Sequence, residues 1–435
     1  MNAVLTPKRY FLNAVLFTGV LTSAFAGGEP LSSTASAPAQ AITTTTGDKN
    51  AIAMSDDLGV GNFSRFPVKI SISLREGYDD NVFTSSIDKQ ASWFTNGGIA
   101  LNYDFGSPRT QISLGAGAGV TYYWDTGNNV DGNDDYDINA YINLSLTHKA
   151  SPRLTFALSS YLTYQSQPDF AQAIGLNRRS GNFFYTQDKG TVSYLWTPRF
   201  STATSYTFVA LRYDDQSVGF FEDRIENVFG NEFRFLLWPT TTLVAEYRFQ
   251  LVSYDRIDRD SMTHFALGGF DHSFSPRFSL SVRAGAEFRD YSSNDPANNG
   301  IDSSPYAEAT LNYALGKNTS LSLTNRYGIE EPDVLTNPSR RTFRTGLAIK
   351  HNFTSRISGQ LGAYYQHDEY DGVDSPTFVA AGFTEDAFDV ALSLRYAITR
   401  WLAIEGGYNH TEVSSDADFR DYSRNRAWAG VNLTF

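Results

Sequence analysis

From residue 67 to its last residue the chain repeats blocks in which apolar and polar side chains alternate. The block 68–75 has Val, Ile, Ile and Leu at its even positions and Lys, Ser, Ser and Arg at its odd positions. Blocks 138–147, 278–289 and 388–396 follow the same pattern. A period of two is that of a β-strand, because successive side chains point to opposite faces. The pattern predicts an all-β fold with strands of about ten to twelve residues, enough for a tilted strand to cross a bilayer.

The connections between blocks alternate between short and long. Several short ones read Ser-Pro-Arg or Thr-Pro-Arg, where proline presets the turn and ends the strand. Eight short and nine long connections predict an antiparallel barrel of about 18 strands, with short periplasmic turns and long extracellular loops. The first and the last strand then both have their outer ends on the side of the short turns. The short turns lie at 107–109, 151–153, 197–199, 238–239, 275–277, 317–318, 354–356 and 399–400, and the long loops near 79–92, 125–135, 165–183, 213–224, 254–261, 289–304, 330–341, 368–384 and 411–424.

A propeller, a solenoid or a set of sandwiches would also be built from short strands, but three features favour a transmembrane β-barrel. An apolar face runs along nearly every block, as a wall surrounded by lipid requires. The chain ends inside an amphipathic block whose last residue is aromatic, which resembles the assembly signal of outer-membrane barrels. Aromatic residues also gather at block ends, where interfacial girdles form. Those predicted at the membrane interfaces are Phe105, Trp124, Trp196, Trp238, Phe274, Trp401 and Phe435.

The first 66 residues differ from the rest. Lys8 and Arg9 precede an apolar stretch at 10–20 that ends in Ala-Phe-Ala at 24–26, the pattern of a secretory signal peptide. We therefore expect a signal peptide at 1–26, a flexible periplasmic leader of small residues and proline at 27–66, and the outer-membrane barrel at 67–435.

The composition excludes several classes of protein. The chain has no cysteine, which rules out disulfide scaffolds, thiolate zinc sites and cysteine nucleophiles. Its 35 basic and 47 acidic residues disfavour nucleic-acid binding. No motif of a hydrolase, zinc protease or phosphate loop is present. His367 and His410, with Asp368 and Glu412 near them in sequence, are the candidates for a barrel hydrolase, but no nucleophile accompanies them. We predict neither an enzyme nor a bound cofactor or metal.

A barrel of 16–18 strands is too wide for side chains to fill, so we expect an aqueous lumen. The charged residues that share parity with the polar face should line it, because a charge facing lipid costs about 2–4 kcal/mol at mid-bilayer. They could form a conduit for solutes, or pair along the wall, with Glu232 and Arg234 against Glu246 and Arg248. A loop or the leader could fill part of this lumen as a plug. No loop is longer than about 20 residues, and the leader at 27–66 is the only other candidate. The predicted lumen residues are Lys69, Arg75, Glu232, Arg234, Glu246, Arg248, Arg283, Glu287, Glu308, Arg326, Arg344, Arg395, Glu405 and Arg426.

Two of the long connections are acidic. The stretch 125–137 has five aspartates and no basic partner within it, and 368–386 has six carboxylates. Clustered carboxylates suit Ca²⁺, but neither stretch has the register of a calcium loop. We favour solvated surface loops.

The run Arg-Glu-Gly-Tyr-Asp-Asp-Asn-Val-Phe at 75–83 resembles the first strand of the Putative beta-barrel porin 2 family, in which that strand commonly ends in Gly-Tyr-Asp-Asp-Asn. The rhythm of hairpins and the terminal Phe435 are similar as well. The resemblance implies an outer-membrane channel of undefined cargo, some relatives being linked with exopolysaccharide export. It implies no catalytic or binding residues. Tyr78 would lie in the outer girdle, and Asp79, Asp80 and Asn81 would turn the chain through side-chain hydrogen bonds to the backbone.

We therefore predict an outer-membrane channel through which hydrophilic solutes diffuse passively, with weak selectivity because the lumen carries both signs. The alternatives are a conduit that exports a polysaccharide, for which a continuous basic track would be expected, and an adhesive or structural barrel that acts through its acidic loops. The expected partners are outer-membrane lipid and lipopolysaccharide, the barrel assembly machinery through Phe435, and small hydrophilic solutes or polysaccharide.

Overall fold

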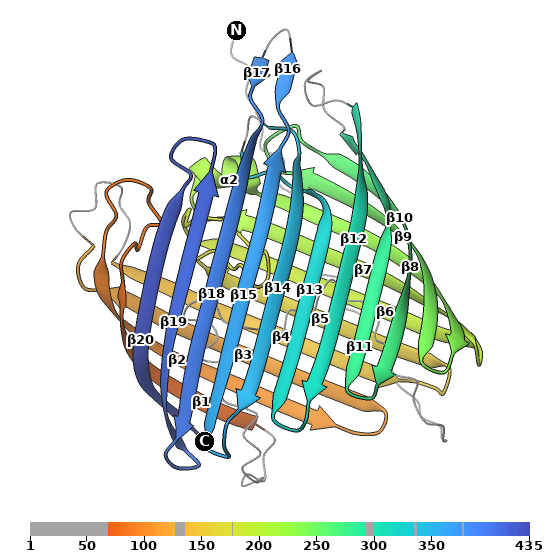
Figure 1. Cartoon of the computed structure of the whole chain (residues 1–435), viewed down its shortest axis with the longest axis horizontal. Helices are drawn as coiled ribbons and strands as arrows, with labels where there is room; N and C mark the ends of the chain where they lie inside the picture. Colours follow the sequence, from red (N-terminus) through yellow and green to blue (C-terminus); the bar gives the residue numbers. More distant parts are fainter. Residues whose placement is uncertain (1–67, 127–134, 176, 292–299, 335–336, 376–377) are drawn as a thin grey trace, which may run out of the picture. The chain divides into compact units, whose positions relative to one another are not determined.

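The computed structural model describes residues 68–435 apart from 127–134, 176, 292–299, 335–336 and 376–377. The predicted signal peptide and leader lie outside the described residues. Within the described part, 18 strands form one antiparallel sheet that closes on itself (Figure 1). These strands are β1 (Val68–Asp79), β2 (Ser92–Gly106), β3 (Thr110–Tyr123), β4 (Tyr136–Lys149), β5 (Leu154–Gln165), β6 (Phe183–Thr197), β7 (Phe200–Tyr213), β8 (Arg224–Trp238), β9 (Thr241–Tyr254), β10 (Ser261–Ser275), β11 (Phe278–Tyr291), β12 (Gly300–Leu315), β13 (Thr319–Glu330), β14 (Arg340–Asn352), β15 (Ile357–Tyr370), β18 (Phe383–Ala397), β19 (Leu402–Ser415) and β20 (Tyr422–Thr434).

The barrel closes where the first strand meets the last. β1 pairs with β20 over nine register partners, from Ser71 opposite Thr434 to Asp79 opposite Arg426. The amide of Phe435 donates to the carbonyl of Ile70 at 2.8 Å, and the amide of Ile70 donates back at 3.1 Å. Closure leaves no open strand edge, which a sheet in hydrocarbon requires because no water is there to pair its backbone groups. The predicted 18-stranded barrel is confirmed.

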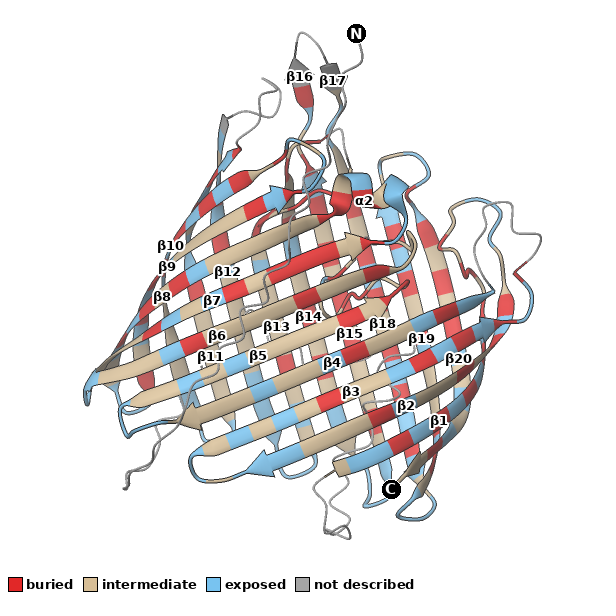
Figure 2. Ribbon diagram, turned by 180° about the vertical axis from the view of Figure 1, so that it is seen from behind, coloured by how far each residue is buried: buried red, intermediate tan, exposed pale blue. Residues whose placement is uncertain are grey.

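The wall is polar inside and apolar outside, the reverse of a soluble protein. On β1, Ile72 and Leu74 are 45% and 53% exposed, whereas Ser73 and Arg75 are 4% and 1% exposed. Figure 2 shows this alternation of buried and exposed positions repeated along strand after strand. The outward residues face lipid, since the sheet surrounds its own polar interior.

The strands are 12 to 16 residues long, longer than predicted. Several predicted loop ranges belong in part to strands, because the ladder of hydrogen bonds continues beyond the apolar band that marks each strand in the sequence. The last residues of β11 and the first of β8 and β14 were assigned to loops for this reason.

The short turns are held by their first side chain. Ser151 Oγ accepts hydrogen bonds from the amides of Arg153 and Leu154 at 3.2 and 3.1 Å. Thr197 Oγ1 accepts in the same way from Arg199 and Phe200 at 3.3 and 3.0 Å. The hydroxyl replaces backbone partners that the proline-containing turn cannot supply, which explains the repeated Ser/Thr-Pro-Arg sequence.

Two of the long connections contain further structure. The helix α2 (Gln216–Glu222) lies between β7 and β8, and the short hairpin of β16 (Val373–Ser375) and β17 (Phe378–Ala380) lies between β15 and β18. The hairpin stands beyond the ends of the barrel strands (Figure 1). No helix in the described part of the chain is long and apolar enough to cross a membrane.

Candidate functional site

The predicted lumen residues fall into groups that differ in exposure. Lys69 is exposed at the start of β1. Those that are buried against other wall residues are Arg75, Glu232, Arg234, Glu246, Arg283, Glu287, Arg395, Glu405 and Arg426. Those that line the central cavity described below are Glu246, Arg248, Arg283, Glu308, Arg326 and Arg344.

One buried network spans β8 to β11. The register sets Glu232 directly opposite Glu246, two like charges that would repel. Arg283 on β11 relieves this, since its guanidinium lies 3.8 Å from Glu232 and 3.7 Å from Glu246, and 2.9 Å from Asp271. Gly269 is the register partner of Arg283 on the intervening strand β10, and it has no side chain to block the arginine.

The predicted pairing within this group is wrong in its geometry. Arg234 pairs with Glu232 two residues away on its own strand, at 2.7 Å, and Arg248 pairs with Glu246 in the same way. Residues two apart on a strand point to the same face, so each arginine finds its partner along the strand before it reaches across. Arg248 also reaches β12, where it lies 2.6 Å from Glu308.

A second buried network crosses the seam of the barrel. Glu405 on β19 lies 3.2 Å from Arg395 on β18 and 3.2 Å from Arg75 on β1. Arg75 passes over β20 at Gly430, where a Cβ atom would meet its side chain at 2.6 Å. As at Gly269, a glycine on the strand between lets an arginine join strands that are not neighbours.

The residues that carry the family resemblance also hold this seam. Asp79 is fully buried, 2.5 Å from Arg424 and 3.0 Å from Arg426 on the last strand. Asp80 accepts from the amide of Asn425 at 2.6 Å. Asn81 donates to the carbonyls of Ser85 and Ser423 at 2.9 and 3.1 Å, so it turns the chain and also reaches the other side of the seam. Tyr78 is 40% exposed on the outer face.

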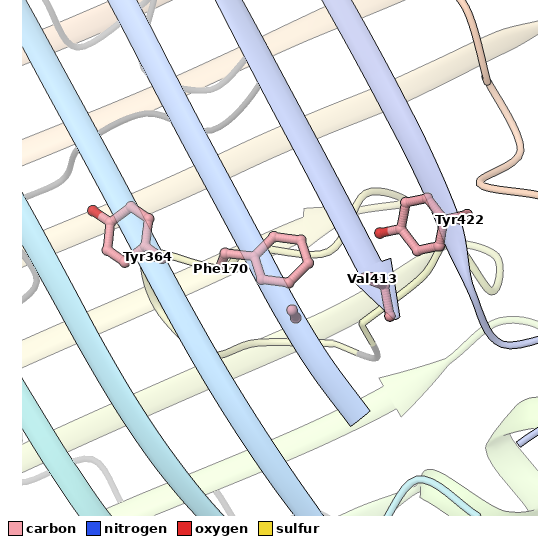
Figure 3. Close-up of a cluster of buried hydrophobic side chains, with 5 residues drawn as sticks. Phe170, Tyr364, Val413 and Tyr422 are labelled. Carbon is pink, nitrogen blue, oxygen red and sulfur yellow. The ribbon is translucent and has the colours of Figure 1, made fainter. Parts of the chain in front are cut away.

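The described part of the loop between β5 and β6, residues 166–175 and 177–182, folds into the barrel, and we call it the inward loop. Its Phe170 is 6% exposed and packs in a cluster with Tyr364, Ala387, Val413 and Tyr422. These four partners come from β15, β18, β19 and β20, and all lie on the inner face (Figure 3). A loop residue can meet them only from within the lumen. The sequence did not identify this loop as one that enters the lumen.

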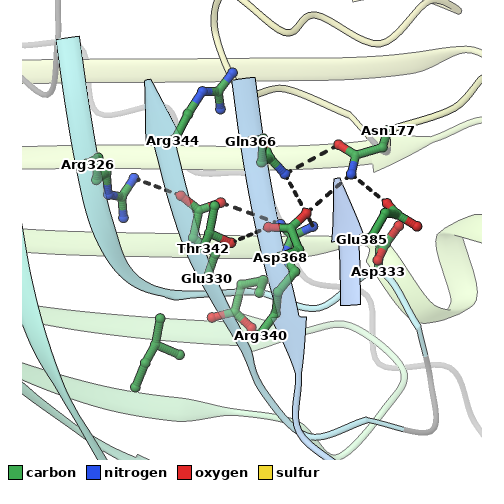
Figure 4. Close-up of polar contacts among 12 residues, drawn as sticks. Asn177, Arg326, Glu330, Asp333, Arg340, Thr342, Arg344, Gln366, Asp368 and Glu385 are labelled. Atoms are coloured by element: carbon green, nitrogen blue, oxygen red, sulfur yellow. Dashed lines mark hydrogen bonds and ion pairs between the residues drawn. The ribbon is translucent and has the colours of Figure 1, made fainter. Parts of the chain in front are cut away.

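Polar contacts hold the inward loop against the same wall. Asn177 Nδ2 donates to Glu385 at 2.7 Å and to Asp368 at 3.3 Å (Figure 4). The hydroxyl of Tyr422 donates to the carbonyl of Asn177 at 2.5 Å. On the other side, Arg179 lies 2.6 Å from Asp137 on β4. The loop is therefore bound to two sides of the barrel wall.

These contacts correct the prediction of solvated acidic stretches. Asp137 does have a basic partner, Arg179, which comes from another loop. Asp368 and Glu385 are 0% and 1% exposed, because β15 and β18 extend past the predicted loop boundary and direct them inward. The positions 127–134 lie outside the described residues.

The loops at the extracellular rim meet at Arg420. Its guanidinium lies 2.6 Å from Glu385 and 2.9 Å from Asp333, a residue of the β13–β14 loop. Burial by itself would raise the pKa of Asp333, but Arg420, Arg340 and the hydroxyl of Tyr370 outweigh burial and hold that pKa well below its usual range. The same carboxylates raise the pKa of Arg420. Both groups are thus charged under all physiological conditions.

The inward loop leaves an open cavity of about 330 Å³ on the side of β6 to β14. The loop contributes uncharged residues at 171–175, and the wall contributes most of the charge. Burial raises the pKa of Glu222, on α2, to about 7, although Arg224 lies beside it. The basic residues in the lining are Lys189, Arg224, Arg248, Arg283, Arg289, Arg326, Arg340 and Arg344, and the acidic ones are Glu222, Glu226, Glu246, Glu308, Glu330, Glu331 and Asp333.

Several of these lining residues were not predicted. Arg224, Arg289, Glu330 and Arg340 lie at strand ends that the sequence assigned to loops. Lys189 lies inside β6. It shares a strand face with Tyr185 and Gln187, which also line the cavity, and this parity could have predicted its position.

The outer surface carries the predicted interfacial aromatic residues. They are 43–65% exposed: Phe105, Trp124, Trp196, Trp238, Phe274, Trp401 and Phe435. His367 bonds at 2.8 Å to Asp386 and not to its sequence neighbour Asp368, since adjacent strand residues face opposite sides. His410 lies 3.7 Å from Glu412. The cavity lining includes neither histidine.

A closed barrel with an apolar exterior and a polar interior is the architecture of bacterial outer-membrane proteins. The sequence profile of the family described as Putative beta-barrel porin 2 matches residues 59–435, and the chain belongs to this family. It is a bacterial outer-membrane protein of the porin type. No curated protein matches it in sequence.

Several solved structures are similar in fold. OccAB4 of Acinetobacter baumannii is 11% identical with a TM-score of 0.41, and the match covers 85% of this chain and 98% of that one. OpdK of Pseudomonas aeruginosa is 12% identical with a TM-score of 0.40, covering 85% and 99%. The siderophore receptor PirA of Pseudomonas aeruginosa is 9% identical with a TM-score of 0.39, covering 85% and 80%.

Proposed function

We propose that the protein is a channel for passive diffusion of hydrophilic solutes through a lumen that carries both signs of charge. The observation that carries the proposal is the open cavity between the inward loop and the wall of β6 to β14. Eight basic and seven acidic side chains in its lining stabilise water and polar solutes over apolar ones.

The charges that are buried in networks within the wall have a different role in this proposal. The networks around Arg283 and around Glu405 are buried in the wall and join strands that are not neighbours. We assign these networks to the stiffness of the barrel, and the other charges of the cavity lining to permeation. Because both signs are interleaved, the channel discriminates weakly between small cations and anions.

The test is single-channel recording of the protein, purified from outer membranes, in a planar bilayer. Steady conductance in KCl, with a reversal potential close to zero under a salt gradient, is the expected result. A barrel that stays closed at all voltages contradicts the proposal.

Export of a polysaccharide receives less support. A conduit for an anionic polymer would be expected to carry a continuous row of basic residues along its lumen. In the cavity lining, carboxylates such as Glu226, Glu308 and Glu330 lie among the arginines. An adhesive role through the acidic loops is also weakened, since Asp137, Asp368 and Glu385 are engaged in holding the inward loop. The porin family and the histidine geometry give no support to an enzyme.

The proposal also covers how the protein itself is secreted and assembled in the outer membrane. Residues 1–26 act as the signal peptide and 27–66 as the leader of the mature chain. Phe435, 65% exposed at the end of the last strand, is the residue that the assembly machinery recognises. Outer-membrane lipid and lipopolysaccharide contact the apolar exterior.

A further inference from the structure

Two arginines face each other across neighbouring strands at the cavity. Arg326 on β13 and Arg344 on β14 are direct register partners. Both line the cavity. Like charges directly opposite on one face of a sheet repel, so this arrangement is unfavourable unless something negative offsets it.

The carboxylates nearby offset it only in part. Arg326 lies 3.3 Å from Glu330, but the same carboxylate also serves Arg340 at 3.4 Å. Among the described residues no carboxylate lies within ion-pair distance of Arg344, whose Nη2 donates instead to the carbonyl of Phe170. Its Nη1 is buried and has no hydrogen-bond partner.

Arg344 differs from the other arginines of the cavity. Each of the others lies within 3.4 Å of a carboxylate: Arg224, Arg248, Arg283, Arg289, Arg326 and Arg340. Arg326 is also open to the cavity, with its side chain 44% exposed. A buried donor without a partner is costly, and an exposed guanidinium beside it offers a further set of donors.

The pair lies in the cavity beside the inward loop. The bond from Arg344 to the carbonyl of Phe170 places this arginine beside that loop, and residues 171–175 of the loop line the same cavity as the two arginines. Two adjacent guanidinium groups present planar forks of N–H donors, which match the two oxygens of a carboxylate or the oxygens of a phosphate.

We propose that Arg326 and Arg344 form a binding subsite for the oxyanion group, carboxylate or phosphate, of a permeating solute. The subsite deepens the proposed channel function and rests on it. The oxyanion supplies the negative charge that the pair lacks and accepts from the unpaired Nη1. A channel with weak selectivity for small ions thereby retains a preferred class of solute.

The test compares succinate with succinamide, which has a similar shape and no charge. Binding to the detergent-purified protein is measured by calorimetry, and block of the KCl current is measured in a planar bilayer. The variants are Arg326→Gln, Arg344→Gln and the double variant. Arg277→Gln, on an exposed periplasmic turn, removes an equal charge far from the cavity. Heat-modifiable migration in gels checks that each variant is a folded barrel.

We expect wild type and Arg277→Gln to bind succinate and not to bind succinamide. The double variant should bind succinate at least about tenfold more weakly. Arg326→Lys should retain part of the affinity, since it keeps the charge and loses the fork. Inorganic phosphate should compete with succinate, and if it binds while succinate does not, the subsite takes phosphate groups. Equal succinate binding in wild type and the double variant overturns the subsite. A conducting channel that binds neither succinate nor phosphate overturns it too and leaves the channel function intact, whereas binding of either anion without any conductance refutes the channel alone.

Discussion

Replacing Phe170 by alanine tests whether the inward loop is held mainly by its one buried aromatic ring. Phe170 is 6% exposed and its partners are on the opposite wall, so the substitution leaves a cavity in that cluster. A buried Phe→Ala change costs about 3–5 kcal/mol, and we take about 3 because a loop readjusts more easily than a strand. At about 1.4 kcal/mol per factor of ten, the ratio of docked to undocked loop falls roughly 150-fold.

The wall itself should be almost unaffected. Phe170 belongs to no strand, so the hydrogen-bond ladder and the networks around Arg283 and Glu405 stay as they are. We expect the variant to migrate as a folded barrel and to show current fluctuations toward a larger conductance. Trypsin should also cleave after Arg178 or Arg179, sites that the docked loop protects.

The matched control is Phe419→Ala, in the β19–β20 loop, where the ring is 71% exposed. It makes the same chemical change without loss of buried contacts and should behave as wild type. If Phe170→Ala shows wild-type current steps and wild-type resistance to trypsin, then the polar contacts of Asn177 and Arg179 hold the loop by themselves, and the reasoning is refuted.

Three further predictions concern the wall and the cavity. Arg283→Met removes the cation shared by Glu232 and Glu246, so that each keeps only the arginine on its own strand, and it should lower the free energy of unfolding in urea by about 3–5 kcal/mol; an unchanged midpoint would show that the network is dispensable. Leu392→Arg, on the lipid-facing side of β18, should cost about 2–4 kcal/mol in the same assay, and Thr310→Arg, in the cavity lining, should cost much less. Since the pKa of Glu222 is raised to about 7, this carboxyl is neutral below that pH and charged above it, so cation selectivity measured by reversal potential should rise from pH 6 to pH 8 in wild type and stay flatter in Glu222→Gln. Equal pH profiles for the two proteins would exclude Glu222 as the titrating group.

The alternation of side chains along the chain was enough to predict the barrel. A period of two determines which residues of a strand share a face, and the lengths of the connections determine how many strands there are and on which side they turn. For the same reason parity assigned residues such as Arg75 and Glu232 to the polar face. Strand ends were predicted less well, since the ladder at Arg224 and Arg340 continues where the apolar pattern has stopped.

Only the tertiary structure decided which charges pair and where the open space lies. Glu232 meets Arg283 because the two strands between β8 and β11 hold them in register and Gly269 leaves a path between them, a contact that depends on the curved wall as a whole. The inward loop has no pattern that distinguishes it from the other polar connections. Its direction follows from contacts between Phe170 or Asn177 and strands that come about 200 residues later in the chain. Local periodicity specifies the faces of a strand, whereas contacts between distant residues arise only when the barrel closes.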